Sequence, residues 1–101
     1  DLQHIELDRA KVTDDGVEAI LRLLGLRGIQ LDGTSITDAA VANFRNGMFE
    51  AKLSNTAITD RSVEKLKTIR SLSHIFLTGT KISPDGAEEL RQALPNCTIV
   101  Y

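Results

Sequence analysis

The 101-residue sequence predicts an α/β fold, a right-handed solenoid of four strand–helix repeats that ends in a closing C-terminal strand. One pattern recurs four times, and the steps from Ala10 to Thr34, Thr56 and Thr80 are 24, 22 and 24 residues. Each copy opens with alternating apolar and polar residues, as in a strand with one buried face. Each copy then continues with apolar residues at helical spacing. A fixed period of this size indicates stacked repeats.

The copies align without gaps through the strand and the turn that follows it. In the clearest copy Leu26, Ile29 and Leu31 form the strand core, and Thr34 and Ile36 form the turn. The strands are expected near residues 3–7, 27–31, 50–54, 73–77 and 98–101. The helices are expected near residues 14–24, 38–46, 60–70 and 84–94. The chain is interpreted as one domain over residues 1–101, with repeats at about 2–25, 26–47, 48–71 and 72–95 and a closing strand at 96–101.

Each helix is expected to start at a hydroxyl residue followed by an acid. Thr and Ser side chains accept backbone N–H groups at a helix start, and acids suit the positive end of the helix dipole. The four starting residues are Thr13, Thr37, Thr59 and Ser83. Pro84 follows Ser83 where a helix tolerates proline best. The strand and turn residues should form one apolar column: Ile29, Leu31, Ile36, Leu53, Ile58, Ile75, Leu77 and Ile82.

The L-x-x-L-x-L strand cores resemble the leucine-rich repeat family over essentially the whole chain. The Asn that usually follows the core in that family is replaced by Thr34, Thr56 and Thr80, and by Ala10 in the first copy. The run Gly-Thr-x-Ile-Thr/Ser followed by Asp is similar to a bacterial subclass common in planctomycete-type proteins. The strand-plus-helix unit also resembles the ribonuclease-inhibitor-like branch. The resemblance implies a parallel sheet on the concave face and a bacterial protein that acts as a binding scaffold.

The outward side chains of such a sheet make its largest continuous surface. Seven of them are the candidate protein-binding residues: Glu6, Asp8, Gln30, Asp32, Lys52, His74 and Phe76. Acidic residues such as Asp8 and Asp32 also occur on strands simply because they are well solvated. Phe76 is an aromatic residue in a polar row, and aromatic residues are enriched at binding hot spots. A single exposed aromatic residue is also common on monomers.

No pattern in the sequence points to catalysis or to a cofactor. Phosphate-binding loops, paired metal-ligand motifs and G-x-S-x-G are absent. His4 and His74 lie three repeats apart, too far to share a metal ion. Cys97 has no matching partner for nucleophilic chemistry and is expected to be inert. We therefore expect a protein that is not an enzyme and that needs neither cofactor nor metal.

Composition narrows the classes of partner. The net charge of −2 gives no general attraction for nucleic acid or acidic membranes. No apolar run is long enough to span a bilayer, and no secretory apolar segment opens the sequence. Cys97 is the only cysteine, which rules out an internal disulfide and fits a reducing compartment. These observations favour a protein partner and a cytoplasmic location.

Two functions fit this pattern. The first is a protein-interaction module that docks its partner on the concave sheet, and the alternative is a structural terminal segment of a larger protein or assembly without a ligand of its own. The strand Leu2–Leu7 has a neighbour on only one side, so its other edge offers unpaired backbone groups. We expect upstream residues, a partner or a second copy of the chain to cover this edge. At the other end Tyr101 is expected to shield the core with its ring while its hydroxyl stays near water.

Overall fold

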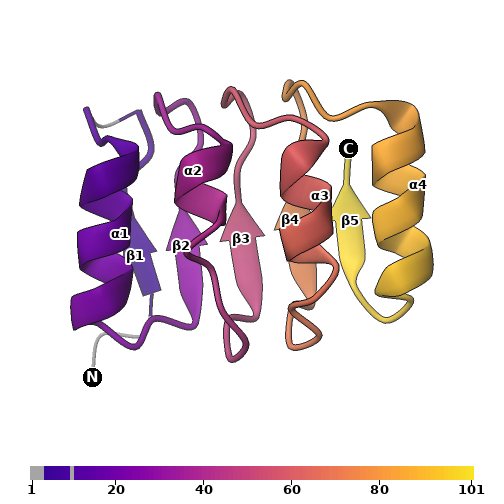
Figure 1. Ribbon diagram of the computed structural model, residues 1–101, viewed down its shortest axis with the longest axis horizontal. Helices are drawn as coiled ribbons and strands as arrows, with labels where there is room; N and C mark the ends of the chain where they lie inside the picture. Colours follow the sequence, from indigo (N-terminus) through magenta and orange to yellow (C-terminus); the bar gives the residue numbers. More distant parts are fainter. Residues whose placement is uncertain (1–3, 10) are drawn as a thin grey trace.

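A computed structural model describes residues 4–9 and 11–101 of the chain. Five strands alternate with four helices (Figure 1). In chain order they are β1 (His4–Glu6), α1 (Asp14–Leu23), β2 (Gly28–Gln30), α2 (Asp38–Val41), β3 (Glu50–Lys52), α3 (Arg61–Leu66), β4 (His74–Phe76), α4 (Pro84–Ala93) and β5 (Thr98–Val100). Leu2 and Ala10, which take part in the first copy of the sequence pattern, lie outside the described residues.

The strands form one parallel sheet in the order β1-β2-β3-β4-β5. The register pairs equivalent repeat positions across all five strands: Ile5, Ile29, Ala51, Ile75 and Ile99. All four helices lie on the same side of the sheet, and each connection passes over it in the right-handed sense (Figure 1). The predicted fold class is therefore confirmed, and the closing strand pairs Ile99 with Ile75.

Two of the predicted helices are too long. The helix expected over 38–46 ends at Val41, and the one expected over 60–70 covers Arg61–Leu66. Beyond these helices the backbone continues in turns whose N–H groups bond the carbonyl three residues back, as Phe44 does to Val41. Such turns rise about 2.0 Å per residue against about 1.5 Å in an α-helix, so fewer residues span the same height. The 22-residue second repeat thus matches the height of its neighbours with less helix.

The apolar column predicted from the sequence is confirmed. All of its eight residues are between 0 and 2% exposed: Ile29, Leu31, Ile36, Leu53, Ile58, Ile75, Leu77 and Ile82. Phe44, in the non-helical part of the second repeat, and Met48, at the start of the third, are equally buried. The core is therefore continuous through the short-helix repeat and needs no helix there to fill it.

The turn after each strand needs one residue in the left-handed region at the same repeat position. Gly33 and Gly79 occupy it with φ of 73° and 76°, which glycine adopts without steric cost. Arg9 and Asn55 occupy it in the other two repeats, with φ of 58° and 59°. Glycine therefore serves this turn in the second and fourth repeats.

The acids at the helix starts have a role that the sequence did not reveal: they join each repeat to the next. The carboxylate of Asp14 accepts hydrogen bonds from the backbone N–H and the hydroxyl of Thr37, at 2.7 and 2.6 Å. Asp38 accepts the same pair from Thr59 at 2.8 and 2.6 Å. We call Asp14, Asp38 and Asp60, which does the same for Ser83, the aspartate ladder.

The predicted capping by hydroxyl residues coexists with this ladder. The hydroxyl oxygens of Thr13 and Ser83 accept from the N–H groups of Gly16 and Gly86, at 3.2 and 3.0 Å. A hydroxyl can donate one hydrogen bond and accept others at once. Thr13, Thr37 and Ser83 cap their own helices. The prediction is wrong for Thr59, because the N-cap of α3 is Asp60, which makes no side-chain cap hydrogen bond. In the second to fourth repeats the Thr or Ser also donates to the preceding carboxylate.

The ladder predicts a specific pH dependence at Asp38. Partial burial acts to raise its pKa, but hydrogen bonds from Ser62 and Thr59 and the charge of Arg61 outweigh burial and hold the pKa below 3.8. Since the folded-state pKa lies below the unfolded one, the stabilisation is complete above about pH 3.8 and is lost as the pH falls through the folded-state pKa. Between about pH 5 and pH 3 the urea midpoint should fall less for Asp38→Asn than for the wild type. Equal falls in the two proteins would contradict a depressed pKa.

Earlier repeats are joined to the next repeat by the aspartate ladder and by a backbone hydrogen bond, and the last repeat lacks both contacts. Pro84 stands in the ladder position and offers no carboxylate. In earlier repeats the carbonyls of Ile36 and Ile58 accept from backbone N–H groups of the following repeat, whereas the carbonyl of Ile82 accepts from the Tyr101 hydroxyl at 2.6 Å. The hydroxyl thus satisfies a backbone acceptor that would otherwise lack a partner, while the Tyr101 side chain remains 44% exposed.

Candidate functional site

The candidate residues lie on the side of the sheet away from the helices, which we call the sheet face. The strand register places the second outward residue of every strand in one row across the sheet. This middle row consists of Glu6, Gln30, Lys52, Phe76 and Val100. Neighbouring members of the row lie about 4.8 Å apart along the sheet, the spacing of paired strands. A single ligand could therefore touch several of them at once.

The apolar half of the middle row lies on β4 and β5. Phe76 is half-buried, and Val100 beside it is 39% exposed. The ammonium of Lys52 lies 5.4 Å from the centroid of the Phe76 ring, within the range of a cation–π interaction. The ring and the ammonium hold each other in place, so Lys52, Phe76 and Val100 form a compact patch with an apolar surface and a positive edge.

The acidic candidate residues of the sheet face lie on β1 or just after β1 and β2. Two of them form hydrogen bonds that join neighbouring strands. One oxygen of Asp8 accepts from the backbone N–H of Asp32 at 3.0 Å, and the other accepts from the side-chain amide of Gln30. Asp32 in turn accepts from the backbone N–H of Ser54 at 2.8 Å. Glu6 is exposed. The interpretation of Asp8 and Asp32 as merely solvated acids is thus wrong, since both carboxylates cap the end of the next strand.

The first row of the sheet face carries both histidines, well apart. The ring of His4 lies over Gly28, where a Cβ atom would be only 2.5 Å from Nδ1. The missing side chain lets the ring reach across β2, and Nδ1 comes within 3.7 Å of Glu50 on β3. His74 on β4 instead contacts the Ser73 hydroxyl at 3.3 Å. In residues 4–9 and 11–101 no three His, Cys, Asp or Glu side chains are grouped as metal ligands would be.

A cation–π pair at the start of the strands was not singled out from the sequence. Phe49, just before β3, is 37% exposed, and the guanidinium of Arg27 lies 5.6 Å from its ring centroid. The equivalent position before β4 is the polar residue Ser73. A large apolar residue at a position that is otherwise polar was the signal that could have pointed to Phe49.

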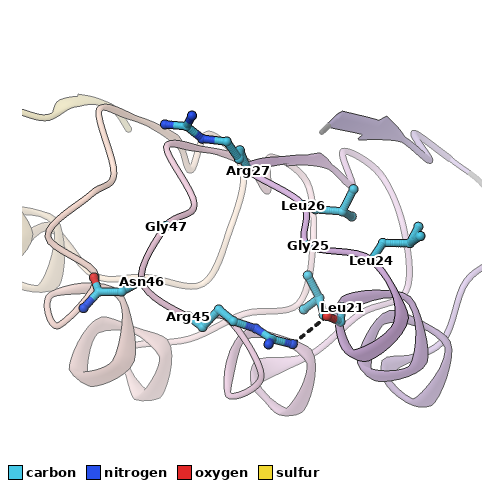
Figure 2. Close-up of a pocket in the computed structure, with 8 residues that line it drawn as sticks. All are labelled: Leu21, Leu24, Gly25, Leu26, Arg27, Arg45, Asn46 and Gly47. Atoms are coloured by element: carbon cyan, nitrogen blue, oxygen red, sulfur yellow. Dashed lines mark hydrogen bonds between the residues drawn. The ribbon is translucent and has the colours of Figure 1, made fainter. Parts of the chain in front are cut away.

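Two cavities lie between helix ends and strand starts. One has a volume of about 280 Å³, and Figure 2 shows how the turns after α1 and α2 enclose it. Its lining residues are Leu21, Leu24, Gly25, Leu26, Arg27, Arg45, Asn46 and Gly47. Arg45 reaches across it to donate to the Leu21 carbonyl at 2.5 Å (Figure 2). Since this bond satisfies the end of α1, Arg45 acts there as a structural contact.

The second cavity, of about 210 Å³, occupies the same place between the third and fourth repeats. Cys97 is among its lining residues, and burial raises the pKa of its thiol. The protonated thiol is the unreactive form. Because the two cavities recur at one position of the repeat, they follow from the way helix ends meet strand starts.

None of the helices in the described part of the chain is both long and apolar enough to cross a membrane. The candidate site is the sheet face, with its apolar patch at β3–β5 and its acids beside β1 and β2.

Comparison with known proteins identifies the fold. No protein-family model matches the chain, and no curated protein matches it either. Among solved structures, a leucine-rich repeat protein of Leptospira interrogans is similar, with a TM-score of 0.64 and 21% sequence identity. The alignment covers 99% of this chain and 31% of that protein, so this chain spans about a third of its length.

Proposed function

Because this chain folds as a leucine-rich-repeat solenoid, we propose that it is a non-catalytic protein-interaction module that binds its partner on the sheet face. The apolar patch of Lys52, Phe76 and Val100 is the observation that carries the proposal. Apolar and aromatic side chains set in a polar surface are the usual anchors of protein interfaces. Repeat stacking supplies the extended surface around the anchor.

The chemistry of the face suggests how a partner would lie on it. An apolar side chain of the partner would cover Phe76 and Val100, and an acceptor group beside it would meet Lys52. His74 lies on the same strand as Phe76 and would contact the partner beside it. A segment that continued across the strands toward β1 would pass Lys52 and Gln30 and reach Glu6, where a positive group would be favoured. Gln30, Asp8 and Asp32 would contribute at this acidic end through the polar atoms that their strand contacts leave available. The positive charge of Lys52 on the central strand and the acids beside β1 and β2 would fix the direction in which the partner binds.

Affinity capture with matched variants tests the proposal. Phe76→Ala combined with Lys52→Glu removes the anchor and reverses its charge. Leu23→Ala combined with Arg22→Glu makes the same kinds of change on α1, where Leu23 is 78% exposed. Folding of both variants would be checked by circular dichroism and thermal melting.

We expect a specific protein from the source organism to bind the wild type and the α1 variant. Its dissociation constant for the sheet-face variant should rise by about 30-fold, since truncating a hot spot costs about 2 kcal/mol. Equal binding by both variants, or loss only in the α1 variant, would overturn the assignment of the face.

The alternative is a structural segment of a larger protein or assembly. One observation favours it: the surface of the first repeat that faces away from the second is incompletely covered, as Ile5 and Leu7 are only partly buried. A structural segment would show no captured partner in the experiment above. The two functions are compatible in one molecule, because the sheet face and the end of the stack are different surfaces.

A further inference from the structure

The first repeat has a surface whose counterpart is buried in each of the other three repeats. Four of its apolar residues are only partly buried: Ile5, Leu7, Val12 and Ile20. Their counterparts in the second repeat are at most 1% exposed: Ile29, Leu31, Ile36 and Phe44. The difference arises because the second repeat is covered by the first, while among the described residues no repeat covers the first. We call this surface of the first repeat the upstream face.

The upstream face also carries backbone groups whose counterparts in later repeats are hydrogen-bonded to the preceding repeat. The carbonyl groups of Gln30 and Lys52 accept from the N–H groups of Leu7 and Leu31, one repeat earlier. Glu6 is their counterpart in β1, and β1 pairs with β2 alone. A strand added in parallel on that side would complete the same pattern.

Two residues on this face, Asp8 and Thr13, carry hydrogen-bond donors at positions that bind carboxylates in later repeats. Thr37, Thr59 and Ser83 each donate two hydrogen bonds to an aspartate of the preceding repeat. Thr13 is their counterpart, and within residues 4–9 and 11–101 neither its N–H nor its hydroxyl hydrogen has an acceptor. Likewise the N–H groups of Asp32 and Ser54 donate to Asp8 and Asp32 of the repeat before them.

We propose that the upstream face is an interface for a further strand–helix repeat that carries one carboxylate at the end of its strand and another at the first residue of its helix. The first carboxylate binds the N–H of Asp8, and the second binds the N–H and hydroxyl of Thr13. The second repeat of this chain has both groups, Asp32 and Asp38, and shows how they bind. This interface is independent of the sheet face.

The downstream end of a second copy of the chain does not have this chemistry. Its ladder position is Pro84, and the equivalent of Asp32 in its fourth repeat is Thr78. Its Ile82 carbonyl is already bonded to Tyr101, and β5 covers its last repeat. The occupant is therefore a repeat with the two carboxylates, and stacking of this chain head to tail on itself does not satisfy Thr13.

A chain extended by one repeat tests the interface. A copy of residues 26–47 placed directly before Leu2, in place of Asp1, puts the copied Asp38 21 residues before Thr13, the same separation that joins Asp38 to Thr59. Amide hydrogen exchange of Thr13 is the readout, with the amides of Thr37 and Thr59 as internal references. We expect exchange at Thr13 to slow by about tenfold or more in the extended chain.

The matched control is the same extended chain with only the copied Asp38 changed to Ala. It should keep the added repeat folded and return Thr13 to fast exchange, since alanine has no side-chain oxygen to accept the Thr13 N–H. Unchanged exchange at Thr13 in the extended chain, with Thr37 still protected, would overturn the proposal. So would failure of the copied repeat to fold against β1. Concentration-dependent dimerisation of the unextended chain that protects Thr13 equally would overturn it in favour of a second copy.

Discussion

Leu53→Ala is expected to lower the free energy of unfolding by about 2–5 kcal/mol, the range for truncation of a fully buried leucine. Leu53 is 0% exposed and follows β3, the central strand of the sheet. The cavity left behind would lie between two repeats on one side and the fourth repeat with the closing strand on the other, where none can move away without losing its strand pairing. In a stack this short each repeat depends on its neighbours, so the whole chain should unfold at lower denaturant.

Equilibrium urea denaturation followed by circular dichroism measures this effect. Leu23→Ala is the control: Leu23 is 78% exposed, so this substitution removes the same atoms from the surface instead of the core. Its midpoint should stay close to that of the wild type. An unchanged midpoint for Leu53→Ala would show that the apolar column is not the core.

Asp38→Ala should have the second largest effect, a loss of about 1–3 kcal/mol. The carboxylate of Asp38 accepts from Thr59 and also from the hydroxyl of Ser62 at 2.6 Å. Ser62 is 1% exposed, so its hydroxyl would lose its acceptor in a place that water reaches poorly. An unsatisfied buried donor costs more than the hydrogen bond contributes on balance.

Asp15→Ala provides the comparison for the ladder. Asp15 is an exposed acid in the first turn of α1, and its carboxylate takes no part in the contacts between repeats that the described residues show. Its removal should cost only the helix-dipole interaction, about 0.3–1 kcal/mol. Equal losses of unfolding free energy for the two variants in urea denaturation would show that Asp38 contributes only a helix-dipole interaction and not the hydrogen bonds of the ladder.

The sequence predicted the strands, their register and the core because these depend on local patterns that recur. An alternating apolar strand such as Ile29–Leu31 can bury only one face, and a fixed period aligns that face from repeat to repeat. The lengths of α2 and α3 could not be predicted in this way. Apolar spacing around Phe44 suits both a helix and a series of tighter turns, and the height of the neighbouring repeats decides between them.

Contacts between repeats were the other part that sequence reasoning missed. Helix capping already accounts for a Thr-Asp pair, so its recurrence at Thr37 and Asp38 did not indicate a second role. The ladder exists because stacking brings each carboxylate to the next hydroxyl, a distance set by the whole repeat. The same holds for Asp8 and Asp32, whose acidic character was correctly placed on the sheet face but whose contacts with the next strand were not anticipated.

For the candidate site, the sequence placed the seven residues on one face of the sheet, and the register shows which of them are neighbours. It did not reveal that Lys52 covers the ring of Phe76, because a side-chain contact between strands depends on rotamers as well as register. Nor did it give weight to Val100, which becomes conspicuous only beside Phe76. The use of this face for binding stays a prediction.

Methyl NMR of the chain with its captured partner tests the proposed sheet-face interaction most directly. The methyl groups of Val100 report on the sheet face, and those of Leu23 report on α1, and both side chains are exposed in the free chain. On addition of the partner we predict shifted or broadened signals for Val100 and unchanged signals for Leu23. Shifts at Leu23 with Val100 unchanged would contradict binding on the sheet face.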